Sequence, residues 1–180
     1  MDLNDLHRRS LEDLGAFVFA AKPADLAAPT PCAGWDLRAL IGHLVAENRG
    51  FASAIGGPGD WTDDRLGDDP AETFAETARE VVGVFTDLER QWSVREFGTF
   101  PGKIAIRMHF IDNVAHSWDV ARALDLPWSP EAGLAEAALT TVLAFPLSRG
   151  PGEAFAAEVD LPAGASAADR FLAYTGRDPR

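Results

Sequence analysis

The chain has 180 residues, of which 47% are hydrophobic and 24% charged, and its formal net charge is −12. This composition is typical of a globular protein with a buried core, and the negative charge argues against a nucleic-acid partner or an anionic membrane surface, because phosphate groups would be repelled. The single cysteine excludes an internal disulfide and a cysteine-rich zinc module. The sequence has neither a signal peptide nor an apolar run near the ~20 residues of a membrane helix, so we expect a soluble cytoplasmic protein that does not enter membranes.

Apolar residues at helical spacing predict a first amphipathic helix over residues 2–21. After a loop rich in proline and glycine, Asp36 is placed to cap a second helix that runs to about Phe51. A polar loop over residues 56–69 precedes a third helix, which begins with the cap and first-turn proline Asp69-Pro70. Its apolar residues alternate by four and three, as in a helix that packs along another: Phe74, Ala78, Val81, Phe85, Leu88 and Trp92.

Residues 94–102 contain a short β-like segment (Phe97, Thr99 and Phe100), and a fourth helix is predicted from about Lys103 to Leu124. Ser129-Pro130 predicts a fifth helix that reaches about Phe145. Alternating apolar residues over 155–161 predict a short strand, and a capping box at Ser166–Asp169 opens a last helix that ends near Tyr174. The expected fold is therefore all-α. It is a single domain over residues 1–180 built on a four-helix bundle, with residues 150–180 as an appendage that holds a short helix and a minor strand.

The predicted fourth helix contains a stripe of metal-ligating residue types. At about 100° per residue, His109, Asp112, His116 and Asp119 share one edge of this helix, and the stripe contains no Lys or Arg. Imidazole nitrogens and carboxylate oxygens aimed at one point can bind a metal, although a solvated polar face explains the same residues equally well. His109 and His116 lie about 10.5 Å apart along the axis, which is a long span for one tetrahedral metal, whereas Asp112 and His116 are four residues apart.

The second helix offers the remaining ligand. His43 lies at the border of its apolar face, and Glu47 follows one turn later. With Asp112 and His116, His43 would give three protein ligands and an open fourth position for a water or a thiol, which is the pattern of catalytic zinc sites.

Five further residues have weaker cases. His109, Glu47 and Asp119 are alternative ligands, or groups that orient the ligands through hydrogen bonds. His7 lies beside the apolar stripe of the first helix, where a structural role is the favoured interpretation. Cys32 lies just before the second helix and is a candidate reactive thiol, but a small buried residue in a packed turn is the favoured interpretation.

Three motifs resemble the mycothiol-dependent maleylpyruvate isomerase N-terminal domain family of the DinB-like superfamily. The first is Thr30-Pro31-Cys32-Ala33-Gly34-Trp35-Asp36 followed by Leu40-Ile41-Gly42-His43-Leu44, and the second is His116-Ser117-Trp118-Asp119-Val120-Ala121-Arg122-Ala123. The third, Ala168 to Pro179, is similar to the end of a short, uncharacterised metal-binding branch of the family.

The resemblance implies a DinB-like four-helix bundle and a divalent metal, commonly zinc, held by His43, Asp112 and His116. The isomerases similar to this chain have Glu in place of Asp112 and carry a further C-terminal domain. The resemblance therefore implies metal binding more strongly than isomerase activity.

The expected function is that of a zinc-dependent enzyme that uses a small thiol such as mycothiol to act on a small electrophilic molecule. An open zinc position binds and deprotonates a thiol, and the resulting thiolate is a nucleophile for isomerisation or group transfer. A metal-dependent hydrolase on the same ligands is a close variant. A non-catalytic metal-binding or ligand-binding protein, in which a fourth protein ligand closes the site, is also compatible with these residues, as is an interaction module without a metal. The oligomeric state stays open.

Overall fold

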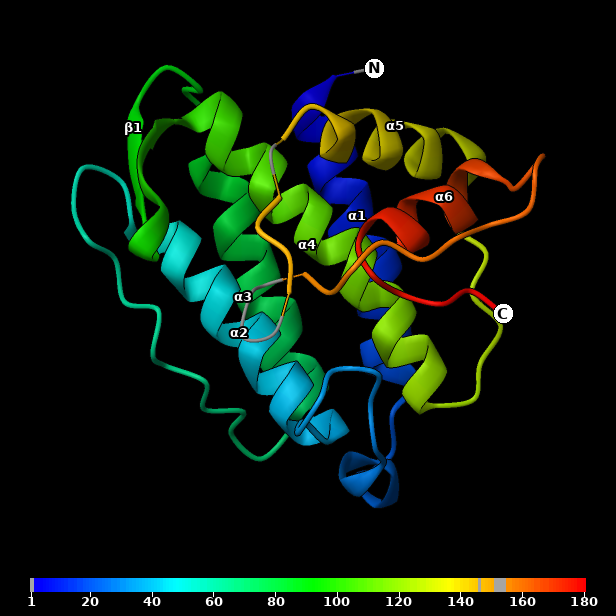
Figure 1. The fold of residues 1–180 in the computed structure, drawn as a ribbon. Coiled ribbons are helices and arrows are strands. Elements are labelled where there is room, and N and C mark those ends of the chain that lie inside the picture. Colours follow the sequence, from blue (N-terminus) through cyan, green and yellow to red (C-terminus); the bar gives the residue numbers. More distant parts are fainter. Residues whose placement is uncertain (1, 146, 151–154) are drawn as a thin grey trace. The chain divides into compact units, whose positions relative to one another are not determined.

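The protein is described by a computed structural model that covers residues 2–145, 147–150 and 155–180. The chain forms two compact units, Met1–Pro127 and Trp128–Arg180. In chain order, the elements of the first unit are α1 (Leu3–Ala20), η1 (Pro23–Ala27), α2 (Leu37–Ser53), α3 (Pro70–Val84), β1 (Gln91–Val94), η2 (Arg95–Phe97), β2 (Gly98–Pro101) and α4 (Gly102–Ala123) (Figure 1). The second unit holds α5 (Ala132–Leu143) and α6 (Ala167–Tyr174).

This content is the predicted all-α class with a small antiparallel sheet added. The organisation as a single domain stays a prediction. Among the described residues, none of the helices combines the length and the apolar character that crossing a bilayer requires.

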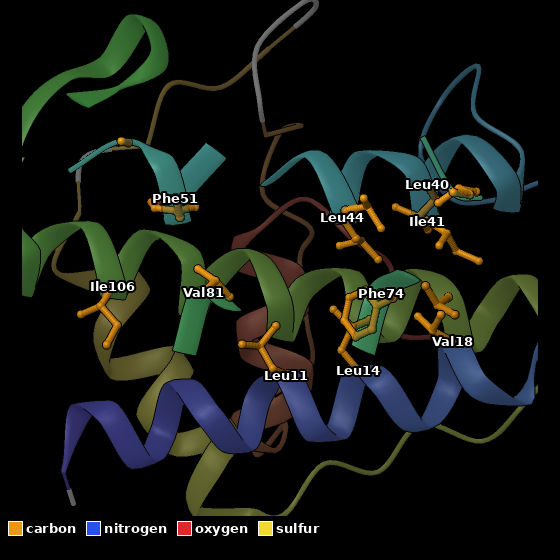
Figure 2. Close-up of a cluster of buried hydrophobic side chains, with 14 of the residues drawn as sticks. Leu11, Leu14, Val18, Leu40, Ile41, Leu44, Phe51, Phe74, Val81 and Ile106 are labelled. Carbon is orange, nitrogen blue, oxygen red and sulfur yellow. The ribbon is translucent and has the colours of Figure 1, made fainter. Parts of the chain in front are cut away.

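A buried apolar cluster holds the helices of the first unit together. α1 packs against α3 and α4, and α2 packs against the same two helices. Burial of one large aliphatic or aromatic side chain contributes roughly 1.5–3 kcal/mol, so this cluster accounts for more stability than local helix propensity does. Figure 2 shows side chains from all four helices in the cluster: Leu11, Leu14 and Val18 of α1, Leu40, Ile41, Leu44 and Phe51 of α2, Phe74 and Val81 of α3, and Ile106 of α4.

Three predicted helix starts are confirmed by side-chain caps. The carboxylate of Asp36 accepts a hydrogen bond from the backbone N–H of Ala39 (2.8 Å) at the start of α2. Asp69 accepts two backbone hydrogen bonds (3.0 and 3.2 Å) at the start of α3. Ser166 and Asp169 form a reciprocal capping box at the start of α6. Each cap satisfies backbone donors that the first helical turn leaves unpaired.

The prediction that the third helix reaches Trp92 is wrong, because α3 ends at Val84. The side chain of Asp87 accepts a backbone hydrogen bond two residues on (3.1 Å), which forms a turn, and the chain returns as β1. On this strand the buried indole of Trp92 donates to the carbonyl of Phe51 (3.0 Å) and stacks on Phe85, with 5.0 Å between ring centroids. The apolar spacing that predicted a helix thus continues across a turn, where tertiary packing decides the backbone conformation.

The strands β1 and β2 form an antiparallel hairpin before α4, where the β-like segment was predicted. Trp92 lies opposite Phe100 in this pair. Gly98 has a φ of 108°, which favours glycine, and a Cβ atom at Gly102 would lie 2.6 Å from the Trp92 ring. Arg95 lies in the connection between the strands with a φ of 38°, which is uncommon for a residue other than glycine.

The second unit differs from the prediction in two places. α5 begins at Ala132 rather than at Ser129-Pro130, because the first helical hydrogen bond runs to the carbonyl of Glu131 (2.8 Å), and it ends at Leu143.

The strand predicted over residues 155–161, and with it the minor strand near the C-terminus, is wrong. Phe155 makes one isolated bridge with Arg149, and no strand is assigned to residues 156–161. The backbone N–H of Val159 donates to the carbonyl of Ala173 (3.1 Å), so this segment bonds to the end of α6.

Candidate metal centre

Two helices of the first unit bring together the three expected metal ligands. Nε2 of His116 lies 3.3 Å from Oδ1 of Asp112, and Nε2 of His43 lies 3.9 Å from Oδ2 of the same carboxylate. The two imidazole rings meet edge to face, with 5.1 Å between centroids. One ligand atom of each residue lies within 4.8 Å of the others. The indole of Trp35 lies against the His43 ring, 4.8 Å between centroids, and provides an apolar wall.

The spacing and the chemistry of these donors fit a divalent metal. For metal–ligand bonds of about 2.0–2.2 Å, tetrahedral ligands stand about 3.3–3.6 Å apart, so small side-chain movements suffice here. Oδ2 of Asp112 is buried and has no hydrogen-bond partner among the described residues. A buried carboxylate oxygen without a partner is costly, and a cation between Asp112 and the imidazoles would satisfy it. Three protein donors leave a fourth position open, as in catalytic sites.

At neutral pH His43 and Asp112 are in the form that binds a metal, whereas His116 must first lose a proton. Burial lowers the pKa of His43 to about 4. The His116 and Arg95 cations also lower this pKa, and the Asp112 charge opposes them. His43 is therefore neutral at neutral pH, and its nitrogen lone pair is available to a metal. Burial acts against the charged form of His116, but the carboxylates of Asp112 and Asp119 raise its pKa well above the usual value. Burial likewise acts against the charged form of Asp112, yet the neighbouring His116 holds its pKa well below the usual range. A metal would therefore take the place of the His116 proton in this ion pair.

The other nitrogen of His116 faces a second group of polar atoms. Nδ1 lies 2.8 Å from Oδ2 of the buried Asp119, so Asp119 can fix the tautomer that leaves Nε2 free to bind a metal. Sγ of Cys32 lies 3.4 Å from the same oxygen and 3.9 Å from Nδ1. Cys32 is placed there by the turn before α2, in which the Thr30 hydroxyl accepts from the Cys32 N–H (3.1 Å) and donates to the carbonyl of Trp35 (2.8 Å).

Glu47 lies beside the donors, one turn after His43, with Oε1 3.7 Å from Nδ1 of His43. Arg95, from the hairpin connection, contacts the Glu47 carboxylate and lies over the Trp61 ring, 5.2 Å from its centroid. Burial and the Asp112 charge raise the pKa of Glu47 to about 8, against the effect of Arg95. Arg95 is not among the residues predicted from sequence, because β1 was not predicted and the hairpin that positions Arg95 depends on it.

His109 lies in a separate buried pair. Its Nδ1 is 2.9 Å from Nε2 of His7 on α1, and its ring stacks on Phe51 with 4.5 Å between centroids. Burial lowers the pKa of His109 to about 4, and burial together with His109 lowers the pKa of His7 well below its usual value. The structural role expected for His7 agrees with this arrangement. A role of His109 as an alternative ligand stays a prediction.

Comparisons with known proteins identify the family of the chain. The sequence model of the mycothiol maleylpyruvate isomerase N-terminal domain matches residues 7–121, a range that includes all three candidate ligands. Curated proteins from two strains of Mycobacterium tuberculosis, both named as uncharacterized, are each 30% identical over 186 aligned positions that cover the whole of both chains. No solved structure matches the chain. On the extent of the domain match, the chain belongs to the mycothiol maleylpyruvate isomerase N-terminal domain family.

Proposed function

We propose that the protein is a zinc-dependent enzyme that uses a small thiol of the mycothiol type to act on a small electrophilic molecule. His43, Asp112 and His116 hold the metal, within a DinB-like four-helix bundle made of α1 to α4. The observation that carries the proposal is Oδ2 of Asp112, which is buried, has no hydrogen-bond partner among the described residues and lies 3.9 Å from Nε2 of His43. Membership of the mycothiol-related family supports the choice of thiol.

The net charge of the donor set suits thiol activation. Two neutral imidazoles and one carboxylate would leave a bound divalent cation with a net charge of about +1, which lowers the pKa of a thiol in the open position and presents it as a thiolate.

The surrounding residues have separate roles in this proposal. Asp119 accepts from Nδ1–H of His116 and holds Nε2 toward the metal. Glu47, whose carboxylate lies 3.7 Å from Nδ1 of His43, is the acid–base group beside the metal. The Trp35 indole excludes water from one side of His43.

Two reactions follow from the same thiolate. Addition to a conjugated double bond removes the barrier to rotation about that bond, and departure of the thiolate then completes an isomerisation. If the thiolate instead displaces a leaving group and stays attached, the reaction is a transfer.

Metal analysis of protein purified without an affinity tag tests the first half of the proposal. Near-stoichiometric metal is expected. His43→Ala and His116→Ala should each lose most of it, whereas His7→Ala should retain it, with folding checked by circular dichroism. Metal far below stoichiometric amounts, or equal loss in His7→Ala, would overturn the ligand set.

Cobalt substitution tests the second half. Addition of a small thiol to the cobalt protein should produce thiolate-to-cobalt charge-transfer absorption, and this absorption should also form in Cys32→Ser, which has no protein thiol. A cobalt spectrum that does not change when thiol is added would reject the thiol chemistry and favour a non-catalytic metal site or a hydrolase.

A further inference from the structure

A second set of metal-ligating atoms lies at the opposite edge of the His116 ring. It consists of Sγ of Cys32, Nδ1 of His116 and Oδ2 of Asp119, and these atoms lie within 4.8 Å of one another. Cys32 is half-buried, whereas His116 and Asp119 are buried. Neither His43 nor Asp112 belongs to this set.

Cys32, His116 and Asp119 do not by themselves form a nucleophilic triad; the carboxylate at the other ring nitrogen, Nε2, is that of Asp112 (3.3 Å). In a triad, the thiol contacts one ring nitrogen and the carboxylate contacts the other, so that the ring passes on the proton. Here Cys32 and Asp119 both approach Nδ1, at 3.9 and 2.8 Å. The sulfur, nitrogen and oxygen atoms therefore converge on one point, as metal ligands do.

The distances between these atoms are close to those in a zinc site. Zinc–sulfur bonds of about 2.3 Å and zinc–nitrogen or zinc–oxygen bonds of about 2.0–2.2 Å place tetrahedral ligands about 3.3–3.6 Å apart. The distance from Cys32 Sγ to Asp119 Oδ2 is 3.4 Å, and that from Cys32 Sγ to His116 Nδ1 is 3.9 Å. The contact between His116 and Asp119, at 2.8 Å, is a hydrogen bond and would lengthen by about 0.5 Å when a metal replaces its proton.

We infer that Cys32, His116 and Asp119 form a second metal position for a thiophilic divalent cation such as Zn²⁺ or Cd²⁺. The thiolate and the carboxylate neutralise such a cation, and the sulfur selects soft metals over Mg²⁺ or Ca²⁺. Binding releases the proton of the thiol and the proton on Nδ1 to solvent. The inference goes beyond the proposed thiol chemistry and does not depend on it.

The two metal positions share His116, so they compete for its neutral imidazole. A neutral imidazole has one nitrogen lone pair and one N–H, so it binds a metal through Nε2 or through Nδ1. A metal bound at Cys32 takes His116 away from the first position. This metal is neutralised by the thiolate and the carboxylate, so it has no net positive charge with which to activate an added thiol. A soft metal bound at Cys32 therefore switches off the position formed by His43 and Asp112.

Titration of the metal-free, full-length protein with Cd²⁺ tests the inference, because cadmium bound to a thiolate has charge-transfer absorption in the ultraviolet. The His43→Ala protein should develop this absorption from the first addition and saturate at one equivalent. In the same background, Asp119→Asn should raise the cadmium concentration at half-saturation by about tenfold or more. Asp125→Asn is the matched control, since Asp125 is exposed on the chain just beyond α4, and it should leave the titration unchanged.

Two results would overturn the second position, provided that circular dichroism shows a folded protein. One is the absence of the absorption in His43→Ala, and the other is an equal half-saturation concentration with and without the Asp119 change, which would mean that Cys32 binds cadmium alone. Cys32→Ser should abolish the absorption. Zinc analysis of the Cys32→Ser protein, which lacks the sulfur ligand of the second position, reports on the first position, so failure of one proposal is distinguishable from failure of the other.

Discussion

Oδ2 of Asp112 on α4 lies 3.9 Å from Nε2 of His43 on α2, and no described residue gives this buried oxygen a hydrogen bond. Asp112→Asn keeps the size of the side chain but removes the charge that a cation needs. Loss of a direct ligand should exceed the ~10–100-fold effect of outer-shell changes, so in the Cys32→Ser background, which lacks the second position, zinc affinity should fall by more than about 100-fold. Competition with a chelating indicator measures the affinity.

Asp125→Asn in the same background is again the matched control and should bind zinc as the Cys32→Ser protein does. If Asp112→Asn retained the zinc affinity of the Cys32→Ser protein, the carboxylate would not be a ligand.

The buried pair of His7 and His109 makes the folded state sensitive to acid. Burial lowers the pKa of His109 to about 4, whereas an unfolded histidine titrates near 6.5. Between about pH 6.5 and pH 4, the unfolded chain binds a proton at His109 that the folded chain does not bind. As the pH is lowered through this range, the free energy of unfolding therefore decreases by about 1.4 kcal/mol per pH unit for this residue.

His109→Gln should reduce the pH slope by that amount, because glutamine does not titrate and can keep a hydrogen bond to His7. Urea unfolding of the metal-free proteins across this pH range measures the two slopes. Equal slopes would show that His109 titrates normally in the folded protein.

The backbone at Arg95 has a φ of 38°, and a pair of substitutions separates this strain from the side-chain contact with Glu47. Arg95→Ala and Arg95→Gly both lose the contact, but only glycine adopts positive φ at little cost. After subtraction of the greater entropy of glycine in the unfolded chain, Arg95→Gly should be more stable than Arg95→Ala by about 0.5–1 kcal/mol. Thermal unfolding provides the comparison, and a more stable alanine variant would contradict the assigned conformation.

Gly50 on α2 lets the Trp61 ring lie directly on the helix. A Cβ atom at Gly50 would lie 2.1 Å from Cε3 of Trp61, so Gly50→Ala should displace the indole and destabilise the protein by about 1–3 kcal/mol. At Gly83 on α3 a Cβ atom meets nothing within 4 Å, so Gly83→Ala should stabilise it by about 0.5–1 kcal/mol through helix propensity. Urea unfolding of both variants measures the contrast. Similar stabilities would show that the loop with Trp61 does not pack against α2.

The parts of the fold that could be predicted from sequence are those governed by local rules. Asp36, Asp69 and Ser166 mark helix starts because a short polar side chain there satisfies backbone donors, whatever the rest of the chain does. Residues four apart on one helix, such as Asp112 and His116, are neighbours for a similarly local reason.

What could not be predicted depends on contacts between distant segments. Trp92 belongs to a strand because its indole bonds to the carbonyl of Phe51, and nothing near Trp92 in the sequence indicates this. Cys32 and His116 are separated by 84 residues, and only the packing of the loop before α2 brings the thiol to the imidazole. The motif that contains Cys32 is visible in the sequence, but its spacing does not reveal which residue it faces.

The donors of the candidate centre belong to helices that are separated in the chain by α3 and the β1–β2 hairpin, so they converge only in the folded protein. A ligand that binds only the folded chain stabilises it by about 1.4 kcal/mol for each tenfold excess of free ligand over its dissociation constant. Proteases degrade the unfolded fraction, and this fraction shrinks as metal becomes available. The cellular abundance of the protein would therefore follow the metal supply, without any change in its synthesis.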